Sequence, residues 1–189
     1  MNVRKVERTV LSVEQSEGNG ARVRRSIGRK ELRNLDPFLM LDEFKVSKPA
    51  GFPDHPHRGF ETVTYVLEGI TAHEDFCGHS GQLKAGDLQS RTNSKYEATD
   101  CPDEEQQKVE PHHTVVLGDG DSVRVENKGS EVSHFVLIAG EPIREPVVQH
   151  GPFVMTTEEE IRQAISDYQT GRNGFERAIN WRSKIRDSF

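Results

Sequence analysis

The sequence is poor in apolar and aromatic residues. Of its 189 residues, 33% are hydrophobic and 7% are aromatic, and only one is tryptophan. A typical globular domain has about 45–50% apolar residues when glycine is counted. The chain can therefore build a core for one domain, but not a large one.

What the chain lacks also excludes several classes of protein. Its two cysteines, Cys77 and Cys101, form no disulfide framework, which predicts a reducing compartment. No apolar run approaches the ~18 residues of a membrane span, and the N-terminus has no apolar signal segment, so we expect a soluble, intracellular protein without a membrane partner. The net charge of −6 argues against direct nucleic-acid binding. No nucleophile elbow or glycine-rich phosphate loop is present.

The most informative segment is GFPDHPHRGFE, residues 51–61. His55 and His57 lie two positions apart, so in an extended segment both imidazoles point to one face and can converge on one metal ion. Prolines and glycines around them restrict the backbone. Imidazole ligands suit Fe, Zn, Cu or Ni rather than calcium or magnesium. The spacing therefore indicates a candidate transition-metal site.

Two long blocks of the chain resemble the pirins, which are iron-binding members of the cupin superfamily. The first block, residues 35–89, contains HPHRGFET, and the second, residues 105–184, contains GPFVMTTEEEI. The resemblance implies a mostly β fold of the cupin type, a jelly-roll β-barrel, with helices near the C-terminus. It also implies that His55 and His57 are ligands of iron (Fe²⁺/Fe³⁺).

The chain departs from the pirin pattern in its middle. Pirins have two cupin barrels, and two domains of about 100–150 residues do not fit comfortably in 189. In the family, the GDLQ of the first barrel leads to a His-x-Glu pair that supplies the other metal ligands. Here GDLQ, residues 86–89, leads to no such pair. We expect an incomplete or chimeric bicupin, with a first cupin part at residues 1–89, a junction at 90–104, a cupin remnant at 105–155 and a helical tail at 156–189.

The resemblance implies two functions from different classes. One is a redox-sensitive transcriptional coregulator in the nucleus and cytoplasm, with transcription-factor complexes of the NF-kappa-B type as partners. The other is a quercetin (flavonol) 2,3-dioxygenase, an oxidoreductase with a flavonol as substrate. A third possibility is a shortened product with neither activity. The missing ligand pair argues against the enzyme, because that chemistry needs a fully ligated metal with open positions.

Replacement ligands for the missing pair remain open. Glu61 matches the acidic position of the wider cupin pattern, and other candidates lie downstream of it. These are Glu97, Glu110, His112 and His113. His112 and His113 are adjacent, so at most one of them can face the interior of a barrel.

The periodicity of the sequence predicts mostly strands. Expected strands span residues 3–13, 23–27, 36–42, 62–67, 72–76, 81–84, 114–117, 122–126 and 135–139. The turn at residues 17–20 predicts a hairpin, and GDGD at 118–121 predicts another. Six basic residues lie in the range from Arg22 to Arg33. They indicate either a patch for nuclear import or for an acidic partner, or an edge strand protected by charge. The alternation of Val23 and Ile27 favours the edge strand.

The C-terminal part of the chain changes to a helical period. Thr157 followed by Glu160 predicts a capping box, and Gly171 predicts the end of that helix. Residues 175–185 predict a second helix.

Overall fold

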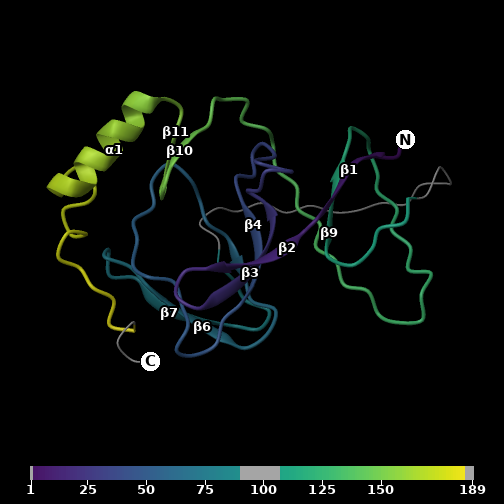
Figure 1. The fold of residues 1–189 in the computed structure, drawn as a ribbon, viewed down its shortest axis with the longest axis horizontal. Coiled ribbons are helices and arrows are strands. Elements are labelled where there is room, and N and C mark those ends of the chain that lie inside the picture. The colour runs from purple at the N-terminus through teal and green to yellow at the C-terminus, as the bar shows by residue number, and fades with distance from the viewer. Residues whose placement is uncertain (1, 90–106, 186–189) are drawn as a thin grey trace. The chain divides into compact units, whose positions relative to one another are not determined.

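The computed structural model describes residues 2–89 and 107–185. The described residues form two compact units (Figure 1). The first unit comprises residues 2–46 and 107–144, and the second comprises residues 47–89 and 145–185. Each unit therefore combines an early stretch of the chain with a late one. Most of the expected junction, residues 90–104, lies outside the described residues, and the expected domain boundaries stay a prediction.

A three-stranded antiparallel sheet forms most of the first unit. Its strands are β2 (Val13–Glu17), β3 (Ala21–Ile27) and β4 (Leu41–Lys45), in the order β2-β3-β4. The turn between β2 and β3 contains Gly18 and Gly20 with φ of 55° and 78°, a conformation that glycine adopts without strain. The hairpin expected here is confirmed. The strand expected at residues 36–42 is wrong in its start, because pairing begins only at Leu41.

β3 is the central strand of this sheet, so its interpretation as a charged edge strand is wrong. Its apolar residues alternate into the core, with Ala21 and Val23 at 0% and 1% exposure. Its arginines are paired with carboxylates on the neighbouring strands. Arg22 and Arg24 contact Glu14, while Arg25 contacts Glu17 and Asp42. The positive charge of β3 is thus largely balanced within its own sheet.

The other sheet of the first unit pairs β1 (Val6–Leu11) with β9 (His113–Leu117), antiparallel. The single strand expected at residues 3–13 is split at Ser12, whose buried hydroxyl group lies 2.7 Å from that of Ser26. The hairpin expected at GDGD is wrong, because β9 pairs with β1 instead of residues 122–126.

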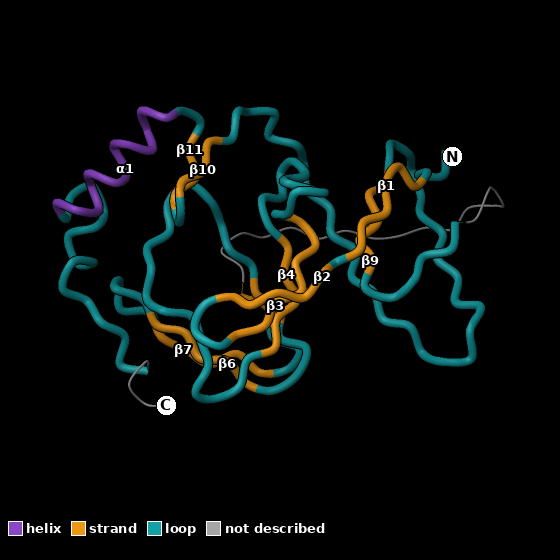
Figure 2. The backbone as a smooth tube through the Cα atoms, viewed as in Figure 1, coloured by secondary structure: helices purple, strands orange, loops and turns teal. Residues whose placement is uncertain are grey.

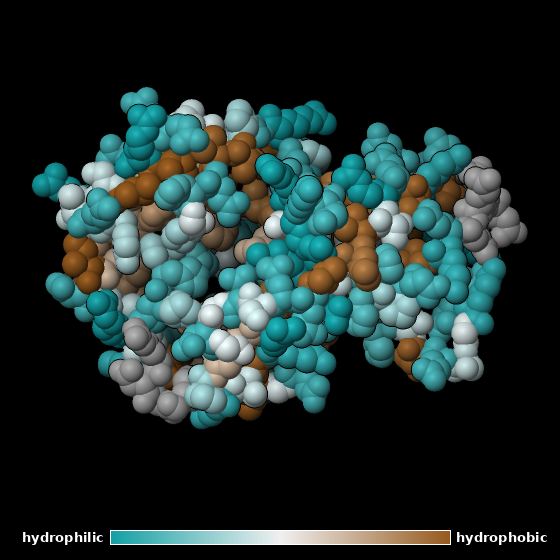
Figure 3. Space-filling model, in the orientation of Figure 1, coloured by the Kyte–Doolittle hydropathy of each residue, from teal (hydrophilic) through white to brown (hydrophobic). Residues whose placement is uncertain are grey.

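Residues 123–140 form no strand, so the strand expected at 135–139 is also wrong. Large apolar side chains of this stretch and its neighbourhood are exposed, and Figure 3 shows hydrophobic side chains at the surface. They include Val125, Val132, Phe135, Val136, Leu137, Ile138 and Ile143. The strand periodicity is present in the sequence, but the described residues provide no neighbouring strand to pair with it.

The second unit contains three small hairpin-like sheets and one helix. β5 (Thr64–Tyr65) pairs with β8 (Leu88–Gln89), β6 (Ile70–Glu74) with β7 (Ser80–Lys84), and β10 (Val148–His150) with β11 (Phe153–Met155). The strand expected at 62–67 shrinks to two residues, whereas the β6–β7 pair lies close to its predicted position. Figure 2 shows how short the strands are compared with the loops that join them.

Helix α1 (Glu158–Thr170) packs on the β10–β11 hairpin (Figure 1). The predicted capping box is confirmed: the Thr157 hydroxyl accepts a hydrogen bond from the Glu160 backbone N–H, and the Glu160 carboxylate accepts one from that of Thr157. The predicted end at Gly171 is confirmed too, with φ of 64°. The helix buries Ile161 and Ala164.

The second predicted tail helix is wrong, because residues 175–185 form turns and extended chain. A carboxylate on β6 takes up backbone donors at the end of this segment. The Oε2 atom of Glu74 accepts hydrogen bonds from the backbone N–H groups of Lys184 (2.8 Å) and Ile185 (3.3 Å) and from the Ser183 hydroxyl (3.0 Å). These N–H groups are therefore satisfied by a side chain instead of by helical carbonyls.

The described residues are thus mostly β with one helix, as the expected fold class requires, but their sheets contain only two or three strands each. None of these sheets closes into a complete jelly roll. In residues 2–89 and 107–185 no helix is long and apolar enough to span a membrane.

Candidate functional site

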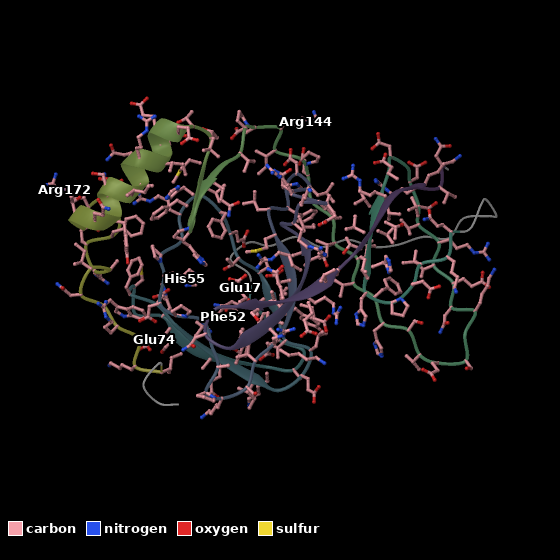
Figure 4. The ribbon with its side chains drawn as sticks, viewed as in Figure 1. Glu17, Phe52, His55, Glu74, Arg144 and Arg172 are labelled. Atoms are coloured by element: carbon pink, nitrogen blue, oxygen red, sulfur yellow. The ribbon has the colours of Figure 1, made fainter. Side chains whose placement is uncertain are left out.

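The histidine loop, residues 51–61, lies between β4 and β5 and has no regular secondary structure apart from isolated bridges at Gly51 and Arg58. Pro56 is buried between His55 and His57, which are both exposed. The loop belongs to the second unit, with the proline on its buried side and both imidazoles on its exposed side. Figure 4 shows the His55 side chain on this loop, and Glu74 on β6 of the same unit.

The two imidazoles face each other as the His-x-His spacing predicts. Their ring centroids lie 4.6 Å apart, with 58° between the ring planes. The Nδ1 atom of His55 lies 2.7 Å from the Pro53 carbonyl oxygen. Because a carbonyl can only accept, Nδ1 donates this hydrogen bond, and Nε2 is the ring nitrogen that remains to face a metal. Metal-binding histidines are commonly oriented by such a bond to a backbone carbonyl.

The surroundings of His57 favour its neutral form. Its pKa is lowered, first because surrounding atoms displace water from the ring and second because His55 is close. The ring also lies 4.8 Å from that of Phe60, measured between centroids. A neutral imidazole is the form that ligates a metal, so the lowered pKa favours the ligating form of His57.

The loop is tied to β11 by backbone hydrogen bonds. The N–H of Arg58 donates to the Pro152 carbonyl (3.3 Å), and the N–H of Val154 donates to the Arg58 carbonyl (3.0 Å). Gly59 lies so close to this strand that a Cβ atom there would be 1.6 Å from the Val154 carbonyl oxygen. Only glycine fits this position, which explains why a glycine follows the arginine.

A cavity of about 300 Å³ lies beside His55 within the second unit. Such a volume is at the lower end of small-molecule pockets. Three of its lining side chains are aromatic and three are ionisable. The lining residues are Asp54, His55, Pro56, Phe76, Tyr168, Ala178, Trp181 and Arg182.

Comparison with known proteins identifies the family. The model of the pirin C-terminal cupin domain matches residues 45–174, a range that includes the histidine loop. The chain belongs to the pirin family. It is 44% identical to pirin from Homo sapiens in an alignment that covers 96% of this chain and 98% of that protein, and 44% identical to pirin from Mus musculus with the same coverage. It is 39% identical to a pirin-like protein from Solanum lycopersicum, which it matches over 97% of that protein's length.

These matches confirm the expected family and the cupin fold class. They also bear on the length of the chain. The alignment with human pirin extends over 284 positions, whereas the chain has 189 residues, so at least 95 aligned positions have no residue in this pirin-family chain. Because the alignment covers nearly all of both proteins, those positions fall inside it. This agrees with the expectation of a pirin that lacks part of its interior.

The described residues do not complete a metal centre. Among the residues that the structure describes, no three side chains of His, Cys, Asp or Glu are grouped closely enough to hold a metal ion. His55 and His57 fit two positions of such a centre, and a cupin-type centre needs three or four. The pair alone therefore suits a weakly held, readily exchanged divalent metal.

Three of the replacement candidates belong to the first unit, one lies on the histidine loop, and one lies outside the described residues. Glu110, His112 and His113 belong to the first unit, where the Glu110 carboxylate contacts Lys108 and the His113 ring contacts backbone carbonyls. Glu61 lies on the exposed end of the histidine loop. Glu97 lies outside the described residues.

Sequence reasoning missed one residue of the loop that the structure makes prominent. The Arg58 side chain reaches the buried carboxylate of Asp167 on α1, at 2.7 Å. A signal was available, because Asp167 lies on the same helical face as Ile161 and Ala164. A carboxylate on a buried face requires a cationic or hydrogen-bonding partner.

Proposed function

We propose that this pirin-family chain acts as a protein-binding transcriptional coregulator in the nucleus and cytoplasm, and that it has no flavonol dioxygenase activity. One observation carries the proposal: two imidazoles are held together on the histidine loop, while the described residues provide no third ligand beside them. The expected partners are transcription-factor complexes of the NF-kappa-B type. Family membership supports this role, which does not require a reaction at the metal.

The dioxygenase alternative requires more from the site than the histidine pair provides. A metal that polarises a bound flavonol must be fixed by several protein ligands and still keep open positions. Two neighbouring imidazoles on one loop leave most positions of the metal to water, so substrate and metal would dissociate together. We therefore expect quercetin turnover at background level.

Iron is the metal that the family resemblance favours, and its proposed ligands here are His55 and His57. Two imidazoles by themselves accept Fe, Zn, Cu or Ni, so the pair alone does not select iron. In this proposal the metal is a loosely bound effector whose charge changes the surface around the loop. Partner binding then responds to metal without depending on it entirely.

The test measures oxygen uptake and partner binding with the same protein. Purified chain, supplied with Fe²⁺, is mixed with quercetin in an oxygen electrode, and its binding to an NF-kappa-B-type complex is measured by surface plasmon resonance. We expect no quercetin-dependent oxygen uptake and measurable partner binding that Fe²⁺ alters. The double variant His55→Ala/His57→Ala should lose the Fe²⁺ effect, whereas His150→Ala, an exposed histidine on β10, should keep it.

Robust oxygen uptake that depends on His55 and His57 would refute the proposal and favour the dioxygenase. Absence of both turnover and partner binding would also refute it, and would support the third possibility of a shortened, inactive product.

A further inference from the structure

The Arg58 side chain makes three contacts with the segment formed by α1 and the residues after it. Its Nη1 atom donates to Oδ2 of Asp167 at 2.7 Å, and its Nη2 atom donates to the Asn173 carbonyl. Its guanidinium group also lies over the Phe175 ring, with Cζ 4.1 Å from the ring centroid. The planar guanidinium thus uses its edge for hydrogen bonds and its face for the aromatic ring, which a lysine cannot do.

The carboxylate that receives Arg58 is fully engaged. The Asp167 side chain is only 6% exposed. Its Oδ1 atom accepts hydrogen bonds from Gln163 (2.8 Å) and Asn173 (2.9 Å), while Oδ2 accepts from Arg58. The Arg58 bond and then the Gln163 bond hold the pKa of this carboxyl group below its ordinary value. Each partner therefore has a fixed position, and Arg58 is the cationic member of this buried group.

Arg58 is also held through its backbone. It forms an isolated bridge with Phe153, and hydrogen bonds from the loop to Pro152 and Val154 lie on either side of this bridge. His57 precedes Arg58 directly, and Gly59 follows it. Fixing both the backbone and the side chain of one residue leaves its neighbour few alternative orientations. An exposed loop without such an anchor would lose more conformational entropy when its side chains bind an ion.

We propose that Arg58 is a positioning residue that holds His55 and His57 together for metal binding by clamping the histidine loop to α1 and Phe175. This inference rests on the proposed role of the histidine pair as metal ligands. It adds that the metal affinity of His55 and His57 depends on a residue that is not itself a ligand. It also adds that residues 167–175 support a site more than 100 positions earlier in the chain. Supporting residues of this kind typically change metal affinity by about 10–100-fold.

The test combines metal affinity with the geometry of the metal-free loop. Zn²⁺, which is stable in air and accepted by imidazole, is titrated calorimetrically into the full chain and into Arg58→Met, Arg58→Lys and Asp167→Asn. Arg162→Met serves as the matched control, because Arg162 is an exposed arginine on α1, the helix that carries Asp167. In parallel, NMR measures the nuclear Overhauser effect between the His55 and His57 rings, whose centroids are 4.6 Å apart in the structure.

We expect Arg58→Met to weaken Zn²⁺ binding about tenfold or more and to reduce the ring-to-ring signal. Arg58→Lys should restore binding only in part, because it keeps the charge but cannot reach both acceptors. Asp167→Asn preserves shape and should weaken binding in the same direction, and Arg162→Met should behave like the parent. The helix signals of each variant, measured by circular dichroism, show that the second unit is folded.

A folded Arg58→Met variant with parental Zn²⁺ affinity and an unchanged ring-to-ring signal would overturn the inference. If the parent itself binds no Zn²⁺, the proposed metal role of the pair fails. The clamp is then judged by the ring-to-ring signal alone. A weaker signal in Arg58→Met and Asp167→Asn supports the clamp, and an unchanged signal refutes it.

Discussion

Replacing Phe175 by alanine should cause a large loss of stability in the second unit. The Phe175 side chain is 3% exposed and belongs to a core cluster with Phe153, Ile161 and Ala164. Its ring centroid lies 5.4 Å from that of Tyr168 and 6.2 Å from that of Phe153, both edge-on. Removing a buried phenylalanine side chain typically costs about 3–5 kcal/mol, because the transfer free energy is lost and a cavity remains. Whole domains are stable by only about 5–15 kcal/mol.

Urea unfolding can measure this loss, because Trp181 is the single tryptophan of the chain and lies in the second unit. With a denaturant slope of about 2 kcal/mol per molar urea, a loss of about 4 kcal/mol lowers the midpoint by roughly 2 M. Phe175→Leu keeps an apolar side chain and should cost less than Phe175→Ala, because it removes fewer buried atoms.

Phe135→Ala is the matched control, since it deletes the same side chain where it is 66% exposed. Its free energy of unfolding should stay within about 0.5 kcal/mol of the parent value. Equal midpoints for Phe175→Ala and Phe135→Ala would refute the packing described for the second unit.

Three further predictions concern the helix, acid stability and the exposed apolar stretch. Thr157→Ala removes the hydroxyl that caps α1 and should cost about 1 kcal/mol in urea unfolding, whereas an unchanged midpoint would contradict the cap. The pKa of Asp167 is lowered on folding from an ordinary value of 3.8, so the folded state binds fewer protons than the unfolded state. The stability that ionised Asp167 contributes is therefore present above pH 3.8 and is lost as pH falls through the lowered pKa. The urea midpoint should therefore fall as pH drops below about 4, and by less in Asp167→Asn, while equal falls would contradict the ion pair with Arg58. Finally, Phe135→Asp should reduce concentration-dependent self-association in gel filtration, because it places a charge in an unpaired apolar stretch; an unchanged elution profile would exclude that stretch as the contact.

The elements that sequence reasoning predicted correctly are those with local causes. The β2–β3 hairpin follows from glycine at the turn and from alternation in Val23 and Ile27. Helix α1 follows from a capping box and a terminal glycine, all within a few residues of the helix. Such signals act over short distances and do not depend on what the rest of the chain contains.

The elements that were predicted incorrectly depend on distant partners. The stretch 135–139 has the composition of a strand, but a strand needs a neighbour to pair with. Residues 175–185 have helical spacing, but Glu74, about 110 positions earlier, takes up the backbone N–H groups of Lys184 and Ile185 at the end of the segment. Neither outcome can be read from the segment itself.

The candidate site divides in the same way. The His55–His57 pair was predictable, because a spacing of two residues places both rings together in an extended loop. The Arg58–Asp167 contact joins residues 109 positions apart, so no local pattern contains it. The pattern that could have indicated it is the carboxylate of Asp167 on an otherwise apolar helix face.

The most direct test of the account is an anaerobic calorimetric titration of the full chain with Fe²⁺, followed by dialysis against a chelator. The account predicts weak binding at one site, loss of that binding in the double variant His55→Ala/His57→Ala, and removal of all iron by the chelator. One iron per chain that survives dialysis, or unchanged binding in the double variant, would contradict it. Tightly held iron would mean that further ligands join the histidine pair, and unchanged binding in the double variant would mean that other residues bind the iron.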